Sequence, residues 1–527
     1  MFFKNFLKEY KFLIVSFLLI FLAFIHSLNL YLYVYDGHHH GLMLSNAQDL
    51  LKGKAPYKEI FIQYGILTTF LHSLVINFFG NHIFSINIFT TILYLSSVFF
   101  ISLTVKKLTN YLYGLLSIFI ILAHHPIPWL PWSNYVAFFF LSLGIYFFQS
   151  EKSKFHYIAG LFFGLSCLSR ENYFIFIFPF FLTFVSTIIF FKNNEKKFLY
   201  KKASIFLLGF ISPIIIFFFY LFFYNLFGYW KDYLVLPFIY IERYETSIFI
   251  LIQNFITFFL TSSFFKFITV PQYILISIIL ITNTLFIFYH LFFSKKINFN
   301  FIFISLLCIF SSVVSVNIEL FRLYTSVIFG LILLLILINK TKNEELKNFF
   351  LFFIIFISLF SVFFYPEGNN KIFKNLNKID YKKISEIPYF KFQRWEEAKI
   401  NPLLEIYHIQ KKIKTNCNIK YGANFTFDAF YFTILELDNI HIVPMTRAGE
   451  LNNKHHLNLF KKRSIYKKLK KELIKKNIIL LISENNYFLD EKEIVFDKTY
   501  TNKEIKLHRK DEKPKILRIY YPKHCLS

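Results

Sequence analysis

The residues that could do chemistry in this chain are few, and they gather in short segments between long apolar runs. Asp36 offers a carboxylate that could accept a proton, and Arg170 offers a guanidinium that could form two parallel hydrogen bonds with a phosphate group. Several imidazoles share these polar segments and could bind a divalent transition metal beside Asp36. They are His38, His39, His40, His124 and His125. These histidines could instead hydrogen-bond lipid headgroups or a sugar, or line a wet cavity.

The composition restricts the class of protein that can carry these residues. The chain has 527 residues, of which 56% are hydrophobic and 17% charged, and 58 basic against 32 acidic side chains leave a formal charge of +26. Phe alone occupies 77 positions. Disordered, collagen-like and disulfide-scaffold proteins do not have this composition, and neither does an ordinary soluble enzyme. The sequence therefore predicts a membrane protein.

About eleven apolar runs are suited to cross a bilayer as helices, because its hydrocarbon core takes roughly 20 helical residues. These runs are 12–33, 83–105, 109–124, 133–149, 155–168, 173–191, 203–226, 270–293, 299–316, 320–339 and 347–365. The first run is too long for a cleavable signal, and no small-residue cleavage site follows it. The predicted fold class is thus a multi-pass α-helical membrane protein.

The lysines predict how these helices are oriented, because basic residues concentrate in cytoplasmic loops. Lysines before the first run and after alternate later runs place the N-terminus inside. This orientation requires that the apolar segments 64–79 and 247–266 do not cross, and both are expected to be interfacial or re-entrant helices on the outer face. The alternative is that both cross and the charge rule fails at two lysine pairs. A large first outer loop at 34–82 follows from the first reading.

The chain is expected to divide into a transmembrane domain, 1–365, and a small extracytoplasmic α/β domain, 366–527. Strands are predicted at 417–422, 439–443, 477–483 and 516–521, and helices at 426–436 and 463–475. The lysines of this domain could face anionic headgroups, a polyanionic acceptor or only solvent. Cys167 and Cys308 lie inside apolar runs, so only Cys417 and Cys525 could pair.

The stretch from Asp36 to Gly80 resembles the first outer loop of the GT-C class of membrane glycosyltransferases, which includes the protein mannosyltransferases and the lipid A aminoarabinose transferases. In that class an Asp follows the first span. An interfacial helix with a Leu-Leu-x-Gly-like turn comes next, then Pro-Tyr, a Tyr-Gly step and an apolar helix that ends in Phe-Gly. The matching pieces here are Asp36, Leu50-Leu51-Lys52-Gly53, Pro56-Tyr57, Tyr64-Gly65 and Phe79-Gly80.

This resemblance implies transfer of a hexose or pentose from a polyprenyl-phosphate carrier to a lipid, glycan or protein acceptor, with inversion at the anomeric carbon. Asp36 would be the general base, and Arg170 would bind the departing phosphate. Asp36 could instead cap a helix or pair with a cation, and Arg170 could pair with Glu171 or anchor its helix at the interface. The site and the domain 366–527 are expected to face the periplasm from the cytoplasmic (inner) membrane.

Other residues of the outer segments are candidates for binding the substrate: Glu59, His38, His39, Tyr64, Arg243 and Arg322. Many members of the class bind a divalent metal through a second acid, whereas this chain has histidines. A metal site, if there is one, would use His40, His124 and His125, and no other cofactor is expected.

Two other classes of function remain open. A lipid-linked oligosaccharide flippase or transporter would carry charged residues near the bilayer midplane and internal symmetry, and neither is visible in the sequence. The other class is a non-enzymatic envelope protein whose outer domain binds a partner. The expected partners are the polyprenyl-phosphate sugar, an unknown acceptor and membrane lipids, and no nucleic acid is expected.

Overall fold

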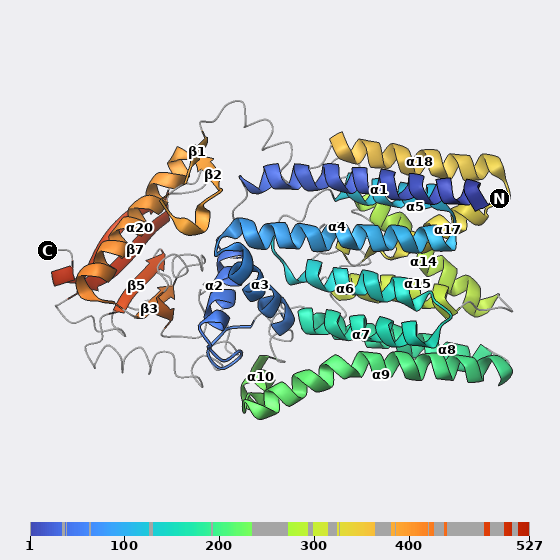
Figure 1. Cartoon of the computed structure of the whole chain (residues 1–527), viewed down its shortest axis with the longest axis horizontal. Helices are drawn as coiled ribbons and strands as arrows, with labels where there is room; N and C mark the ends of the chain where they lie inside the picture. The colour runs from blue at the N-terminus through green and yellow to red at the C-terminus, as the bar shows by residue number, and fades with distance from the viewer. Residues whose placement is uncertain are drawn as a thin grey trace.

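A bundle of apolar helices and a smaller α/β unit at one end of it make up the protein (Figure 1). The computed structural model describes residues 2–33, 37, 39–62, 65–125, 130–190, 193–233, 272–293, 299–314, 324–325, 327–363, 381–384, 386–419, 421–425, 437–439, 479–484, 500–507 and 515–525. The predicted fold class, a multi-pass helical membrane protein with a small α/β C-terminal domain, is confirmed.

Each bundle helix overlaps one of the apolar runs of the sequence. They are α1 (Phe2–Tyr31), α4 (Ile83–Leu108), α5 (Tyr111–His124), α6 (Ser133–Phe148), α7 (Ser153–Ser169), α8 (Ile177–Phe190), α9 (Asn193–Phe223), α14 (Gln272–Phe292), α15 (Phe299–Val314), α17 (Gly330–Lys340) and α18 (Glu344–Phe363). Among the described residues, 5 helices are long and apolar enough to cross a membrane: Tyr10–Tyr31, Ile83–Leu108, Leu199–Phe223, Gln272–His290 and Glu344–Val362. Several of the others are shorter, so the total of about eleven crossings stays a prediction.

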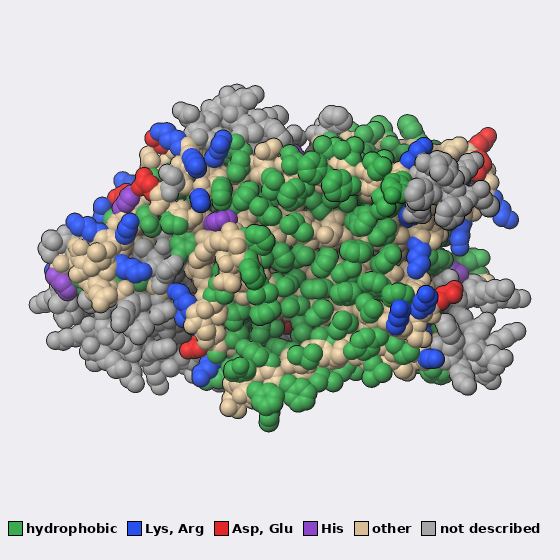
Figure 2. Space-filling model, viewed as in Figure 1, with side chains coloured by type: hydrophobic (Ala, Val, Ile, Leu, Met, Phe, Trp, Pro, Cys, Tyr) green, Lys and Arg blue, Asp and Glu red, His purple; other side chains and the backbone are tan. Residues whose placement is uncertain are grey.

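The surface of the bundle has the pattern of a protein embedded in lipid. On the face shown in Figure 2, a broad band of hydrophobic side chains covers the helices, with lysines and arginines gathered beyond both ends of the band. Phe17, Phe78 and Phe223 belong to this exposed apolar surface. Such a surface would be unstable in water and is stable in a hydrocarbon environment.

Polar residues at the turns set where the bundle helices begin. The Oδ1 atom of Asn110 accepts hydrogen bonds from the N–H groups of Leu112 and Tyr113, at 3.0 and 3.3 Å, and so caps α5. At the opposite end of α4, His82 Nδ1 accepts from the N–H of Ser85 at 3.1 Å. Both caps satisfy N–H groups that have no partner inside the helix, so α4 and α5 begin at defined positions.

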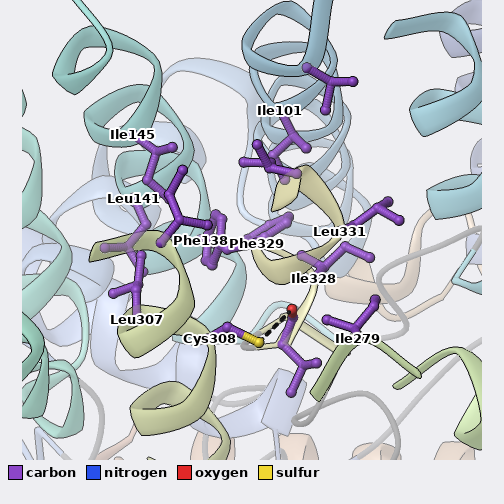
Figure 3. Packing of buried hydrophobic residues seen from close by; sticks show 14 of the residues in the cluster. Ile101, Phe138, Leu141, Ile145, Ile279, Leu307, Cys308, Ile328, Phe329 and Leu331 are labelled. Atoms are coloured by element: carbon purple, nitrogen blue, oxygen red, sulfur yellow. Dashed lines mark hydrogen bonds between the residues drawn. The ribbon is translucent and has the colours of Figure 1, made fainter. Parts of the chain in front are cut away.

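Aromatic and branched aliphatic side chains fill the centre of the bundle (Figure 3). The rings of Phe138 in α6 and Phe329 have centroids 5.2 Å apart. The Sγ atom of Cys308 donates to the carbonyl oxygen of Val327 at 3.4 Å, which ties α15 to the segment before α17. Helices from distant parts of the sequence are therefore packed into one core.

The segment 34–82, predicted to be the first outer loop and given that name below, contains two helices, α2 (His39–Leu51) and α3 (Ile66–Phe79). Both lie at the end of the bundle that faces the α/β unit (Figure 1). Here α3 corresponds to the segment 64–79, for which an interfacial helix was expected. The other such segment, 247–266, lies outside the described residues.

The α/β unit consists of a small hairpin, one long helix and a mixed sheet. The hairpin is β1 (Tyr381–Lys383) with β2 (Arg394–Glu396), and α20 (Glu397–Cys417) follows it. The sheet has the order β4-β3-β5-β7-β6, formed by β3 (Tyr421–Phe425), β4 (Asp438–Asn439), β5 (Ile479–Glu484), β6 (Tyr500–Leu507) and β7 (Lys515–Pro522). Short helices complete the described elements: α10 (Phe227–Tyr233), η1 (Glu171–Phe176), η3 (Pro388–Phe390) and η4 (Lys523–Cys525).

One strand prediction was wrong at its start. Residue Cys417 ends α20, and the strand begins only at Tyr421. Helical spacing puts Ile406, Ile409 and Ile413 on one buried face, so the helix extends to Cys417. Cys417 and Cys525 form a disulfide. The helices predicted at 426–436 and 463–475 lie outside the described residues.

The α/β unit packs on the first outer loop and on the end of α1. Its apolar residues form one cluster with residues of α2, α3 and the start of α4. Gln393 Nε2 donates to the carbonyl oxygen of Tyr31 at 2.7 Å, and the N–H of Arg394 donates to the carbonyl oxygen of Leu32 at 2.6 Å. These bonds fix the chain just before the segment that contains Asp36.

Candidate functional site

The polar turn between α2 and α3 is closed by its own residues. Glu59 accepts a hydrogen bond on Oε2 from the N–H of Ala55 at 2.8 Å, and its own N–H donates to the carbonyl oxygen of Ala55 at 2.8 Å. Tyr57 has a φ of 64° and is buried, with its ring centroid 6.3 Å from that of Phe217 in α9. The Glu59 carboxylate, a predicted substrate-binding group, is thus exposed and engaged in holding this turn.

The next part of the loop lies directly against the end of α7. A Cβ atom added at Gly65 would lie 2.3 Å from the carbonyl oxygen of Leu168 and 2.3 Å from backbone atoms of Ser169. Thr68 Oγ1 donates to the carbonyl oxygen of Ser169 at 2.9 Å. Only glycine permits this approach of two backbones, and the first outer loop is thereby held at the turn that carries Arg170.

Glu171 joins the same two segments. Its Oε2 accepts a hydrogen bond from the N–H of Gly65 at 3.0 Å. Burial raises the pKa of the Glu171 carboxyl to about 7, although its backbone hydrogen bonds and the nearby Arg170 act in the opposite direction. The carboxyl therefore titrates near neutral pH while it remains attached to the first outer loop.

Arg170 lies at the C-terminal end of α7 and points to the start of α6. Its Nη1 donates to Asn134 Oδ1 and, at 3.5 Å, to Ser133 Oγ. Just before these residues, the ring of Trp132 has its centroid 4.6 Å from that of His39. The structure thus brings two predicted substrate-binding residues, His39 and Arg170, to the start of one helix.

The three histidines proposed as metal ligands do not fit one metal site. His40 Nε2 hydrogen-bonds Asn87 Oδ1 at 3.0 Å, and His125 Nε2 hydrogen-bonds the Tyr135 hydroxyl at 2.9 Å. Both ring nitrogens of His124 face hydroxyls of α18, Ser358 at 3.2 Å and Ser361 at 2.9 Å. Within the described part of the chain, the group that brings three ligand atoms together is Cys417, His524 and Cys525, and its two cysteines form the disulfide.

Sequence reasoning missed several polar residues of this region. Ser133 and Asn134 directly follow a tryptophan and open a helix, which is a capping pattern that could have indicated them. His72 is fully buried in α3, and neither ring nitrogen has a hydrogen-bond partner in the described part of the chain. Burial, with a smaller contribution from His40, lowers the pKa of His72 to about 3, so this imidazole is neutral.

Five predicted site residues lie outside the described residues: Asp36, His38, Tyr64, Arg243 and Arg322. The described residues on either side of Asp36 are nevertheless fixed. Leu32 is bound by the α/β unit, and His39 contacts Trp132 beside Arg170.

The chain is similar to known membrane glycosyltransferases. Residues 64–217 match the sequence model of the dolichyl-phosphate-mannose-protein mannosyltransferase family. The fold is similar to that of ArnT from Cupriavidus metallidurans, solved with bound undecaprenyl phosphate. The alignment covers 96% of this chain and 97% of the ArnT chain, with 8% identity and a TM-score of 0.56. The alignment with the same protein in its apo state covers 97% of this chain and 98% of the ArnT chain, with 8% identity and a TM-score of 0.52.

An archaeal protein has a similar fold. It is the oligosaccharyltransferase AglB from Archaeoglobus fulgidus, solved in complex with an inhibitory peptide and a dolichol-phosphate. The alignment covers 90% of this chain and 70% of the AglB chain, with 12% identity and a TM-score of 0.50. A search of curated protein sequences finds no match.

Proposed function

We propose that this chain, which has the fold of the GT-C membrane glycosyltransferases, transfers a sugar from a polyprenyl-phosphate carrier to a lipid, glycan or protein acceptor. The reaction would take place at the outer face of the cytoplasmic membrane, with the domain 366–527 on the same side. Proteins of this fold have been solved with undecaprenyl phosphate and with a dolichol-phosphate, which supports a lipid-phosphate donor.

The observation that carries the proposal is the junction of two segments at Arg170. The first outer loop, which should bring Asp36, is held against the end of α7 at Gly65. The guanidinium that follows is oriented by Asn134. The proposed reaction needs a base and a cation close to each other. The loop that should bring the Asp36 carboxylate is held beside the oriented guanidinium of Arg170.

The chemistry assigns a separate role to each charge. Asp36 takes the proton of the acceptor hydroxyl or amine as its oxygen or nitrogen attacks the anomeric carbon. The bond between that carbon and the phosphate oxygen breaks, and Arg170 stabilises the negative charge on the released polyprenyl phosphate. The remaining candidate residues are proposed to bind the donor or the acceptor: His38, His39, Tyr64, Arg243 and Arg322. No step is assigned to a metal.

The test is sugar release by the purified full-length protein. It would be incubated with a panel of polyprenyl-phosphate sugars, both hexoses and pentoses, and the sugar that leaves its carrier would be identified. The Asp36→Asn variant should lose most turnover, roughly 10²- to 10⁴-fold. The matched control is Glu345→Gln, an exposed acid in the first turn of α18.

The result can contradict the proposal in two ways. If the Asp36→Asn variant releases sugar as fast as the wild type, Asp36 is not the general base. If the protein moves an intact lipid-linked sugar across the membrane of reconstituted vesicles and no sugar leaves its carrier, the chain is a lipid-linked oligosaccharide flippase or transporter instead.

A further inference from the structure

A buried lysine lies at the other end of the bundle, far from the α/β unit. Lys202 in α9 is 7% exposed, and its Nζ donates to Asn300 Oδ1 in α15 at 2.7 Å. Two aromatic rings flank the ammonium, with the Phe148 centroid at 4.3 Å and the Phe299 centroid at 5.4 Å. The Asn300 amide accepts from one of the three N–H groups that a lysine ammonium carries, and the two rings add cation–π contacts.

This ammonium has no acidic neighbour in the part of the chain that the structure describes. No ion pair of Lys202 with a carboxylate is found there, and two basic groups, Lys107 and His156, interact electrostatically with its ammonium. His156 is itself engaged, since Nε2 lies 2.7 Å from the carbonyl oxygen of Ser150. A buried charge surrounded by other basic groups is costly unless an anion pairs with it.

A second buried polar group in this region is the side chain of Gln149, the residue that follows α6. Gln149 follows Phe148, whose ring contacts the ammonium, and precedes Ser150, whose carbonyl group contacts His156. Its side chain is buried, and among the described residues neither the amide nitrogen nor the amide oxygen has a hydrogen-bond partner. Buried amides are normally hydrogen-bonded, so a ligand that accepts from the nitrogen would remove much of this cost.

We propose that Lys202 and Gln149 form an anion site that binds the oxygens of a phosphate group. Lys202 lies in the first third of α9 and Gln149 directly follows α6, so the site is near the end of the bundle away from the α/β unit, which is the end predicted to be cytoplasmic (Figure 1). The phosphate could be the headgroup of an anionic lipid of the inner leaflet or a soluble phosphate. This site is separate from the region around Arg170 and does not depend on the proposed sugar transfer.

The experiment measures binding to the purified full-length protein in neutral detergent. The probes are short-chain phosphatidylglycerol, short-chain phosphatidylcholine and inorganic phosphate, each titrated by calorimetry. The variant Lys202→Met keeps the apolar stem and removes the charge. The matched control is Lys154→Met, because Lys154 is an exposed lysine at the same end of the bundle.

The proposal expects Lys202→Met to weaken binding of phosphatidylglycerol or of phosphate at least about 10-fold, while Lys154→Met binds as the wild type does. Binding of phosphatidylglycerol alone identifies a lipid headgroup, and binding of phosphate alone identifies a soluble anion. Equal binding by wild type and Lys202→Met, or no binding of either probe by the wild type, overturns the proposal.

A second variant covers the case in which Lys202→Met does not fold. Gln149→Leu keeps the size of the side chain and removes its hydrogen-bonding atoms. It should weaken binding of the same probe with the lysine intact. Unchanged affinity in this variant would contradict the role of Gln149 and, without a folded Lys202→Met, would overturn the site.

Discussion

The N–H of Gly65 donates to the Glu171 carboxylate at 3.0 Å, across a separation of 106 residues in the sequence. This bond joins the first outer loop to the turn that carries Arg170. The same loop contains α2 and α3, on which the α/β unit packs. A change at Gly65 or Glu171 should therefore affect both the stability of the loop and the position of the proposed reacting groups.

Gly65→Ala should destabilise the protein, because the added Cβ would lie 2.3 Å from backbone atoms of α7 that cannot rotate away. Overpacking of this kind typically costs about 1–3 kcal/mol. The measurement is the thermal unfolding midpoint together with sugar release. Gly228→Ala is the matched control, since a Cβ there meets nothing within 4 Å. Equal midpoints for the two variants would contradict the close approach.

Glu171 should make stability depend on pH. Its folded pKa is raised from 4.5 to about 7, so the folded state holds more protons than the unfolded state between these values. The free energy of unfolding should then fall as pH rises through this window. The variant Glu171→Gln keeps an oxygen that accepts from Gly65 and does not titrate, so its midpoints at about pH 5 and about pH 8 should differ less than those of the wild type. If the midpoint of Glu171→Gln changes with pH as much as that of the wild type, other groups cause the pH dependence.

The sequence predicted the fold well where one physical requirement dominates. A bilayer requires long apolar helices with their backbone groups paired, so the apolar runs marked the helices of the bundle and the resemblance to the GT-C class is confirmed. Where no such requirement acts, local patterns were ambiguous. The short apolar stretch after Cys417 was predicted as a strand, although the helical spacing of Ile409 and Ile413 continues the helix to that cysteine.

The site was less predictable, because its contacts join distant residues. The order of the apolar runs predicts an outer position for Arg170, but it does not reveal the partner Asn134, which lies on another helix. The histidines illustrate the opposite error. They were grouped by chemical type, whereas His124 hydrogen-bonds the hydroxyl of Ser361 in α18 and His125 hydrogen-bonds that of Tyr135 in α6.

Asn134→Ala should weaken use of the lipid-phosphate donor without removing the cation. The guanidinium of Arg170 would lose the acceptor that orients it, and one hydrogen bond to a charged group is typically equivalent to about 10- to 100-fold. The expected loss is in kcat/KM for the donor, and Arg170→Ala should lose more. Arg518→Ala is the control, because Arg518 pairs with Glu504 in the sheet at 2.8 Å. Unchanged kinetics in Arg170→Ala would remove the phosphate assignment.

Cys417→Ser should destabilise the α/β unit, because the disulfide with Cys525 closes a loop with a sequence separation of 108. Loss of such a link typically costs about 2–4 kcal/mol. Reducing agent should lower the unfolding midpoint of the wild type and leave that of Cys417→Ser unchanged. In intact cells, disulfides persist in oxidising compartments, so an impermeant thiol reagent should label this pair only after reduction. Labelling of both cysteines without reductant would contradict the bond and remove its support for an outer location of the unit.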